Sequence, residues 1–308
     1  MIKRLGVMID CSRDAVYRVN TLKRFIDIIS KMGFNTLMLY TEDTYSLDDE
    51  PYFGYMRGRY SNTEIKELDD YAYSKNIELI PCIQTLAHLS SVCRWQEYSN
   101  ECVDGNDSLL VGANKTYELI EKMFKWAHEC FRSKYIHIGM DEAFSVGTGR
   151  YLNDFGYEPQ YKILYKHLLR IEEIAKKYNK VCLLWSDMFV KNANNGEYYP
   201  YEFKMTQEII DSIPKDMELI YWDYNHTNKE HFLKQIEGHK KFNNKLWFSG
   251  AVWSNLGFSP HTEYSNKCLN ASINACLEKD IENILITSWK DDGAESSLFV
   301  ILRTLAYV

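Results

Sequence analysis

The feature that most constrains this sequence is a regular alternation of short apolar runs with amphipathic helical segments. The apolar runs predict eight strands, at residues 4–10, 35–40, 77–83, 134 to about 138, 180–185, 218–222, 245–250 and 283–288. The helical segments lie at 16–32, from about 61, and at 115–131, 158–178, 204–213, 228–242, 264–278 and 295–307. Strict alternation predicts a parallel sheet. Eight repeats, with no GxGxxG after the first strand, favour an α/β fold closed into a (β/α)8 TIM barrel, with residues 1–308 as a single domain.

Composition fits one globular domain, with 45% hydrophobic and 26% charged residues. The net charge is −7 and no basic stripe occurs, which argues against nucleic acid as a partner. No apolar stretch reaches the roughly 20 residues of a membrane helix, and the N-terminal run is too short for a secretory signal. We therefore expect a cytoplasmic protein with no membrane partner. The eight cysteines show no CxxC or Cys/His ligand spacing and are expected to be reduced and mostly buried. The sequence leaves a homodimer open.

Two adjacent carboxylates, Asp141 and Glu142, follow the fourth apolar run in the stretch KYIHIGMDEAF, and a Gly-rich turn comes next. In a parallel barrel, charged residues at the C-terminal ends of strands lie where active sites are built. A DE dipeptide is also common in solvated turns and in first helical turns, where negative charge is favourable. His137 and Gly139 on the same strand, and polar or aromatic residues at the other strand ends, favour the catalytic interpretation.

The other strand ends carry carboxylates, an arginine and aromatic rings. They are Asp10 and Arg13, Glu42 and Asp43, His88, Trp185 and Asp187, Asp223 and Tyr224, Trp253, and Trp289 with Asp291. Charged groups of this kind hydrogen-bond hydroxyls, and flat aromatic faces with polar edges suit sugar rings. The pattern predicts a carbohydrate pocket rather than a metal site, because only His88, and with it His137 or His226, is placed to bind a metal.

The strand HIGMDEA, with the pattern HxGxDE, resembles the signature of glycoside hydrolase family 20, the β-N-acetylhexosaminidases. Further matches follow in the same order along nearly the whole chain: Arg13, His88, Trp185, the YWDY stretch 221–224, Trp253, and Trp289 with Asp291. The resemblance is to a short bacterial branch, a catalytic barrel without the family's usual N-terminal domain. Many members end the last strand in Trp-x-Glu, where this chain has Trp-Lys-Asp. Extra helices often follow the barrel, so the end at Val308 leaves a natural short form and a piece of a longer protein both open.

The resemblance implies an exo-acting β-N-acetylhexosaminidase that needs no cofactor or metal. It would release terminal β-linked GlcNAc or GalNAc with retention, by a substrate-assisted mechanism in which the acetamido oxygen attacks the anomeric carbon and forms an oxazolinium ion. Asp141 would hold the acetamido N–H, Tyr221 or Tyr224 its carbonyl oxygen, and Glu142 would protonate the leaving oxygen and later activate water. The implied substrate-binding residues are Arg13, His88, Trp185, Tyr221, Asp223, Trp253, Trp289 and Asp291.

Other interpretations of these residues stay open at this point. Adjacent residues on a strand point to opposite sides, so Asp141 and Glu142 can serve one reacting centre only if the strand ends or kinks there. Arg13 could form a surface ion pair, His88 could support Asp141 or contact the ligand, and the tryptophans could be ordinary core. The roles of Glu42, Asp43, Asp187 and Glu295 are undecided. A non-catalytic glycan-binding barrel and a metal-dependent barrel hydrolase are the rival functions, and the choice between GlcNAc and GalNAc is not specified.

Overall fold

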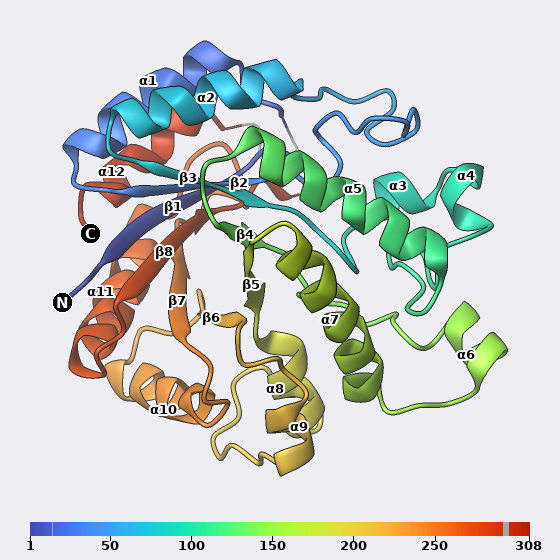
Figure 1. Ribbon diagram of the computed structural model, residues 1–308. Helices are drawn as coiled ribbons and strands as arrows, with labels where there is room; N and C mark the ends of the chain where they lie inside the picture. The colour runs from blue at the N-terminus through green and yellow to red at the C-terminus, as the bar shows by residue number, and fades with distance from the viewer. Residues whose placement is uncertain (14, 292–295) are drawn as a thin grey trace.

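The computed structural model describes residues 1–13, 15–291 and 296–308. Eight parallel strands form a closed barrel in chain order, with β1 pairing to both β2 and β8. The strands are β1 (Arg4–Asp10), β2 (Thr36–Tyr40), β3 (Glu78–Cys82), β4 (Tyr135–His137), β5 (Val181–Trp185), β6 (Glu218–Trp222), β7 (Leu246–Ala251) and β8 (Asn283–Ser288). The predicted barrel is therefore confirmed, and the bounds of β1, β6 and β8 are those expected from the sequence (Figure 1).

Helices surround the barrel on its outside (Figure 1). They are α1 (Val19–Lys31), α2 (Asn62–Ser74), α3 (Ser90–Cys93), α4 (Gln96–Ser99), α5 (Asn114–Cys130), α6 (Arg150–Phe155), α7 (Gln160–Lys177), α8 (Asp187–Ala193), α9 (Gln207–Asp211), α10 (Lys229–Lys240), α11 (Thr262–Glu278), the 3-10 helix η2 (Leu298–Ile301) and α12 (Leu302–Leu305). None of the helices in the described residues is long and apolar enough to span a membrane.

Several helical predictions need correction. Instead of one helix over 295–307, the described residues hold η2 and α12, and Glu295 lies outside the described residues. The predicted helix 204–213 is reduced to α9, and α8 begins directly after β5, where no helix was predicted. The short helices α3, α4 and α6 were also missed. Helices of four to seven residues show too few turns for a clear apolar period.

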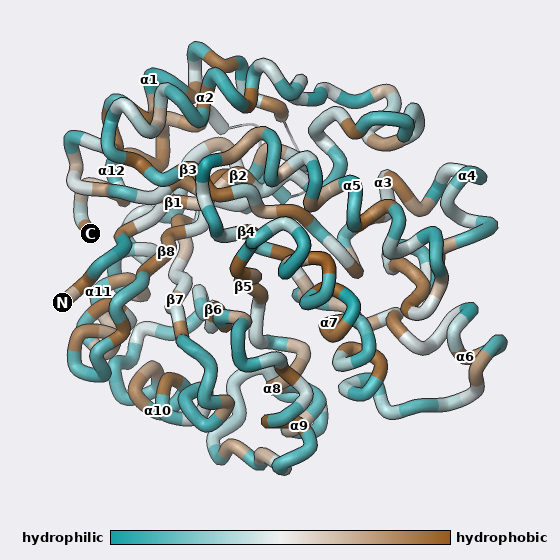
Figure 2. Tube along the Cα trace, viewed as in Figure 1, coloured by the Kyte–Doolittle hydropathy of each residue, from teal (hydrophilic) through white to brown (hydrophobic). Residues whose placement is uncertain are grey.

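The core has two layers, one inside the barrel and one between barrel and helices. Alternate residues of each strand point to opposite faces, so Met8 lies inside while Val7 and Ile9 face the helices. On the helix side, α1 buries Leu22, Phe25, Ile26 and Ile29 completely. Each such side chain stabilises the fold by about 1.5–3 kcal/mol. In Figure 2 the tube alternates between brown and teal along the helices, as expected for elements with one apolar side.

Candidate active site

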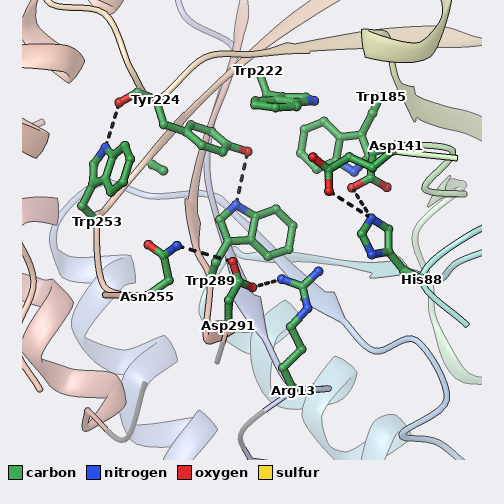
Figure 3. A pocket seen from close by; sticks show the side chains of 12 residues that line it. Arg13, His88, Asp141, Trp185, Trp222, Tyr224, Trp253, Asn255, Trp289 and Asp291 are labelled. Atoms are coloured by element: carbon green, nitrogen blue, oxygen red, sulfur yellow. Dashed lines mark hydrogen bonds and ion pairs between the residues drawn. The ribbon is translucent and has the colours of Figure 1, made fainter. Parts of the chain in front are cut away.

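A cavity of about 200 Å³ opens at the C-terminal ends of the strands. Its lining comprises Arg13, His88, Asp141, Glu142, Trp185, Trp222, Tyr224, Ala251, Trp253, Asn255, Trp289 and Asp291 (Figure 3). These residues come from the ends of six strands and the loop after β3, so the barrel brings together side chains that are far apart in the sequence. The cavity is smaller than the roughly 300–1,000 Å³ of sites for drug-sized ligands, and this size suits one sugar ring.

Asp141 and Glu142 both reach the cavity because the backbone turns sharply after β4. Gly139, Met140 and Glu142 have φ values of 73°, 78° and 49°, all in the left-handed region. This confirms the condition that the strand must end or kink at the two carboxylates. A side chain at Gly139 would place its Cβ 1.8 Å from Gln84 Oε1, so only glycine fits this turn.

Asp141 is held in its ionised form by three groups. Gln84 Nε2 donates to Asp141 Oδ1 at 3.0 Å, and His88 Nε2 lies 3.2 Å from Asp141 Oδ2. Burial opposes ionisation of Asp141, but His88, Gln84 and Arg13 outweigh it and lower the pKa of Asp141 to about 2. Burial likewise opposes protonation of His88, but Asp141 outweighs it and raises the pKa of His88 to about 9. At neutral pH the two form an ion pair, so His88 supports Asp141 and also lines the cavity.

Glu142 is more accessible, with 41% of its side chain exposed. Tyr198 donates its phenol O–H to Glu142 Oε1 at 3.1 Å, and His88 Nε2 lies 3.8 Å from Glu142 Oε2. The backbone N–H of Glu142 donates to Asp187 Oδ2 at 3.0 Å. Burial, together with the charge of Asp141, raises the pKa of Asp187 to about 7. Asp187 does not line the cavity, and its bond to the backbone N–H of Glu142 connects it to the site.

Arg13 lies beside Asp291 at the lower edge of the cavity in Figure 3. Its guanidinium forms an ion pair with Asp291 and donates to the hydroxyl of Tyr40 at 3.2 Å. Arg13 Nε also lies 3.5 Å from Glu42 Oε1. Asn255 donates to Asp291 Oδ2 at 3.4 Å. A fixed arginine beside a carboxylate offers both donors and acceptors to the hydroxyl groups of a sugar.

Aromatic rings form the walls of the cavity. Trp289 Nε1 donates to the hydroxyl oxygen of Tyr224 at 3.2 Å, and Trp253 Nε1 donates to the Tyr224 carbonyl at 2.7 Å (Figure 3). Trp222 stacks on Tyr224 with ring centroids 5.1 Å apart. Since the Tyr224 oxygen accepts from Trp289, its own O–H proton can be donated to an acceptor in the cavity. Trp185, Trp253 and Trp289 are therefore cavity walls, as predicted.

Two residues predicted to bind substrate lie outside the cavity lining. Tyr221 faces the helix layer, where its ring stacks on His239 at 4.4 Å, and its hydroxyl donates to Asp223 Oδ2. Asp223 is buried on the same side. The prediction that Tyr221 and Asp223 lie in the pocket was wrong. Successive side chains point to opposite sides here, and Trp222 and Tyr224 are the two that point into the cavity. Of the two tyrosines left open for the acetamido carbonyl, Tyr224 is the one that lines the cavity.

Sequence reasoning also missed Trp222, Ala251 and Asn255 as lining residues. Trp222 lies within the YWDY stretch, but the apolar run of β6 does not show which of these residues face inward, and nothing in the sequence distinguishes Ala251 or Asn255. Asp43 pairs with Arg57 outside the lining, and Glu42 accepts from Tyr40 at 3.0 Å behind Arg13.

Asp223, His226 and His231 bring three potential metal ligands within 4.8 Å of one another. His226 Nδ1 and His231 Nε2 lie 2.9 and 2.8 Å from the same oxygen, Asp223 Oδ2. The two imidazole rings are stacked, with centroids 3.6 Å apart and planes 14° from parallel. A metal bound at about 2.0–2.1 Å has to lie near the plane of each imidazole. Stacked rings cannot both meet that requirement for one ion, so this arrangement fits hydrogen bonds that hold Asp223 better than a metal site.

A parallel barrel with adjacent carboxylates in an aromatic-walled cavity at its C-terminal end is the arrangement expected of a glycoside hydrolase. The family model described as glycosyl hydrolase family 20, catalytic domain, matches residues 4–240. The chain belongs to this family, as its HxGxDE strand predicts.

Relatives and solved structures agree with this assignment. Hexosaminidase D of Bos taurus is 22% identical over 294 residues, which cover 89% of this chain and 80% of the bovine protein. The "Probable beta-hexosaminidase" of Arthroderma benhamiae is 24% identical over 229 residues, but these are 63% of this chain and 37% of the fungal protein. The fold matches the β-N-acetylhexosaminidase of Bacteroides fragilis with a TM-score of 0.72 at 18% identity, covering 99% of this chain and 65% of that one. The exo β-N-acetylglucosaminidase of Vibrio harveyi gives a TM-score of 0.72 at 15% identity, covering 99% and 53% of the two chains.

Proposed function

We propose that the protein is an exo-acting β-N-acetylhexosaminidase that releases terminal β-linked GlcNAc or GalNAc with retention. The observation that carries the proposal is the pairing of an ionised Asp141 with the neighbouring, more exposed Glu142 on one turn of backbone. Two carboxylates in different environments can take different roles in one reaction.

Glu142 is the general acid. Its side chain lines the cavity, where it can protonate the oxygen of the leaving group and later deprotonate the attacking water. The electron pair of the breaking bond from the anomeric carbon goes to the leaving oxygen, which receives the proton of Glu142. The acetamido oxygen of the substrate forms the new bond to the anomeric carbon.

Asp141 and Tyr224 hold the acetamido group between them. The ionised carboxylate of Asp141 can accept the acetamido N–H, and its negative charge stabilises the oxazolinium ring. Tyr224 can donate its O–H to the acetamido oxygen, because its own oxygen already accepts from Trp289. The cavity volume and the Arg13–Asp291 pair fit one terminal sugar whose outer hydroxyls are bound on that side.

Hydrolysis of nitrophenyl N-acetyl-β-glucosaminide and its galacto epimer, compared with the plain nitrophenyl β-glucoside, tests this function. We expect hydrolysis of the N-acetylated sugars and almost none of the glucoside, with competitive inhibition by GlcNAc-thiazoline, a stable mimic of the oxazolinium ion. Efficient glucoside hydrolysis would contradict the substrate-assisted mechanism. Sugar binding without turnover would favour a glycan-binding barrel instead.

We also propose a reducing, cytoplasmic location, as the sequence led us to expect. All eight cysteines are buried free thiols, which is typical of proteins kept in a reducing compartment. Fractionation of cells that produce the protein from its natural gene, with the activity assayed in each fraction, tests the location.

A further inference from the structure

Glu142, the proposed general acid, has an accessible side chain, so its carboxyl group has to be held in one orientation for catalysis. Glu142 lies on a left-handed turn with φ of 49°, and 41% of its side chain is exposed. A free glutamate samples many rotamers, and only those that direct a carboxyl oxygen at the leaving group are productive. The lining of the cavity does not by itself explain how Glu142 Oε1 is fixed, because His88 approaches only Oε2.

Tyr198 supplies the missing contact from outside the cavity lining. It belongs to the segment between α8 and α9, and its phenol O–H donates to Glu142 Oε1 at 3.1 Å. Burial, together with the charges of Glu142 and Asp187, raises the pKa of Tyr198 far above its ordinary value, so the phenol keeps its proton and stays a donor.

The ring of Tyr198 is itself fixed on several sides. Lys191 Nζ lies 3.7 Å from its ring centroid, a cation–π contact, and Phe144 meets it edge-on at 6.5 Å. Its ring centroid is 5.4 Å from that of Trp222, which stacks in turn on Tyr224. Tyr198 therefore connects the side of the cavity that holds the acid to the side that holds the acetamido oxygen.

We propose that Tyr198 is a positioning residue for Glu142. Its O–H fixes Glu142 Oε1 as an acceptor and so leaves the transferable proton on Glu142 Oε2. This inference rests on the proposed function. During cleavage the proton passes from Oε2 to the leaving oxygen, the electron pair of the breaking C–O bond goes to that oxygen, and the Tyr198 O–H stabilises the carboxylate that remains on Glu142.

Tyr198→Phe tests the proposal because it keeps the ring and its contact with Lys191 and removes only the hydroxyl. We expect kcat on a GlcNAc disaccharide, which has a poor leaving group, to fall roughly tenfold, equivalent to about 1.4 kcal/mol. On a dinitrophenyl glycoside, which needs little acid assistance, the loss should stay within about threefold. KM should hardly change, because Tyr198 does not line the cavity.

Tyr201→Phe is the matched control, since Tyr201 lies on the same segment, is 77% exposed and packs its ring against Lys234. It should behave as the wild type on both substrates. Titration with GlcNAc-thiazoline counts folded sites, so a loss of folded enzyme is not mistaken for a loss of rate. Equal losses on both substrates, or none, in Tyr198→Phe would overturn the positioning role. If the wild type hydrolyses neither substrate, the proposed function itself fails.

Discussion

Replacing Asp141 by Asn tests the centre of the proposed mechanism. The substitution keeps the size of the side chain and an oxygen that can accept from Gln84, but it removes the negative charge beside the expected oxazolinium ring. The side chain of Asp141 is 12% exposed, so its charge acts in a partly water-excluded setting with an effective dielectric constant of about 20.

The size of the effect follows from Coulomb's law. Two full charges about 4 Å apart interact by about 4 kcal/mol at this dielectric constant. The transition state carries only part of a positive charge, so we expect a loss of about 2–4 kcal/mol. This corresponds to a fall in kcat/KM of roughly 30- to 1,000-fold.

The assay compares kcat/KM on nitrophenyl N-acetyl-β-glucosaminide with the inhibition constant of GlcNAc-thiazoline. Both should worsen by a similar factor in Asp141→Asn, because the inhibitor resembles the charged intermediate. Asp291→Asn is the matched control: it also removes one carboxylate from the lining, but on the side of Arg13. We expect it to raise KM several-fold and to leave the ratio of inhibitor to substrate affinity unchanged.

A second readout follows the partner of Asp141. Asp141 raises the pKa of His88 to about 9, so in Asp141→Asn the pKa of His88 should fall by more than one unit, measured by NMR titration of the imidazole. Lost activity with unchanged thiazoline binding would refute the electrostatic reasoning. A glycosyl ester trapped on Asp141 by a fluorosugar would refute the substrate-assisted mechanism.

Further predictions concern the proposed acid Glu142, the wall residue Trp289, and Asp187 and Gly139, which shape the backbone of the site. Glu142→Gln should keep sugar binding and lose roughly 10²- to 10⁴-fold in kcat on poor leaving groups but less on good ones; equal losses would remove Glu142 from the acid role. Trp289→Ala should raise KM without unfolding the barrel, and severe destabilisation with normal kinetics would return this ring to the core. The pKa of Asp187 is raised to about 7, so the folded state loses stability as the pH rises from about 4 to about 7, and the loss is constant above that range. Asp187→Asn removes this loss and should therefore raise the melting temperature more at pH 8 than at pH 5. An equal rise at both pH values would contradict the raised pKa. Gly139→Ala should destabilise the fold by more than Gly33→Ala, which has a similar φ but nothing within 4 Å of an added Cβ, as denaturant unfolding can show.

The sequence predicted the barrel because its signal is repeated and local. A strand buried on both faces reads as an apolar run, and each run is followed by a helix with an apolar side, so eight repeats reinforce one another. Because such a run is apolar at every position, it does not show which residues face the inside of the barrel and which face the helices. In β6 both Leu219 and Ile220 are apolar and buried, so the alternation that sends Tyr224 into the cavity and Tyr221 away from it cannot be read from the run alone.

Sequence reasoning reached the contacts that hold Glu142 only in part, because Asp187 was noted at a strand end without a role and Tyr198 was not singled out. Asp187 and Tyr198 lie 45 and 56 residues from Glu142, and they reach it only because α8 starts directly at the end of β5 and the following segment folds back. Asp187 belongs to the pattern of polar strand ends, but that pattern does not show its contact with Glu142, and Tyr198 is one of 23 tyrosines. The residues proposed to touch the sugar come from strand ends and the loops that follow them, whose place the barrel dictates, whereas Tyr198 comes from the connection between α8 and α9, whose path is set by packing. A search for further positioning residues in this family should therefore begin with the segment between β5 and β6, where in this chain Asp187 accepts from the backbone N–H of Glu142 and Tyr198 donates to its carboxylate.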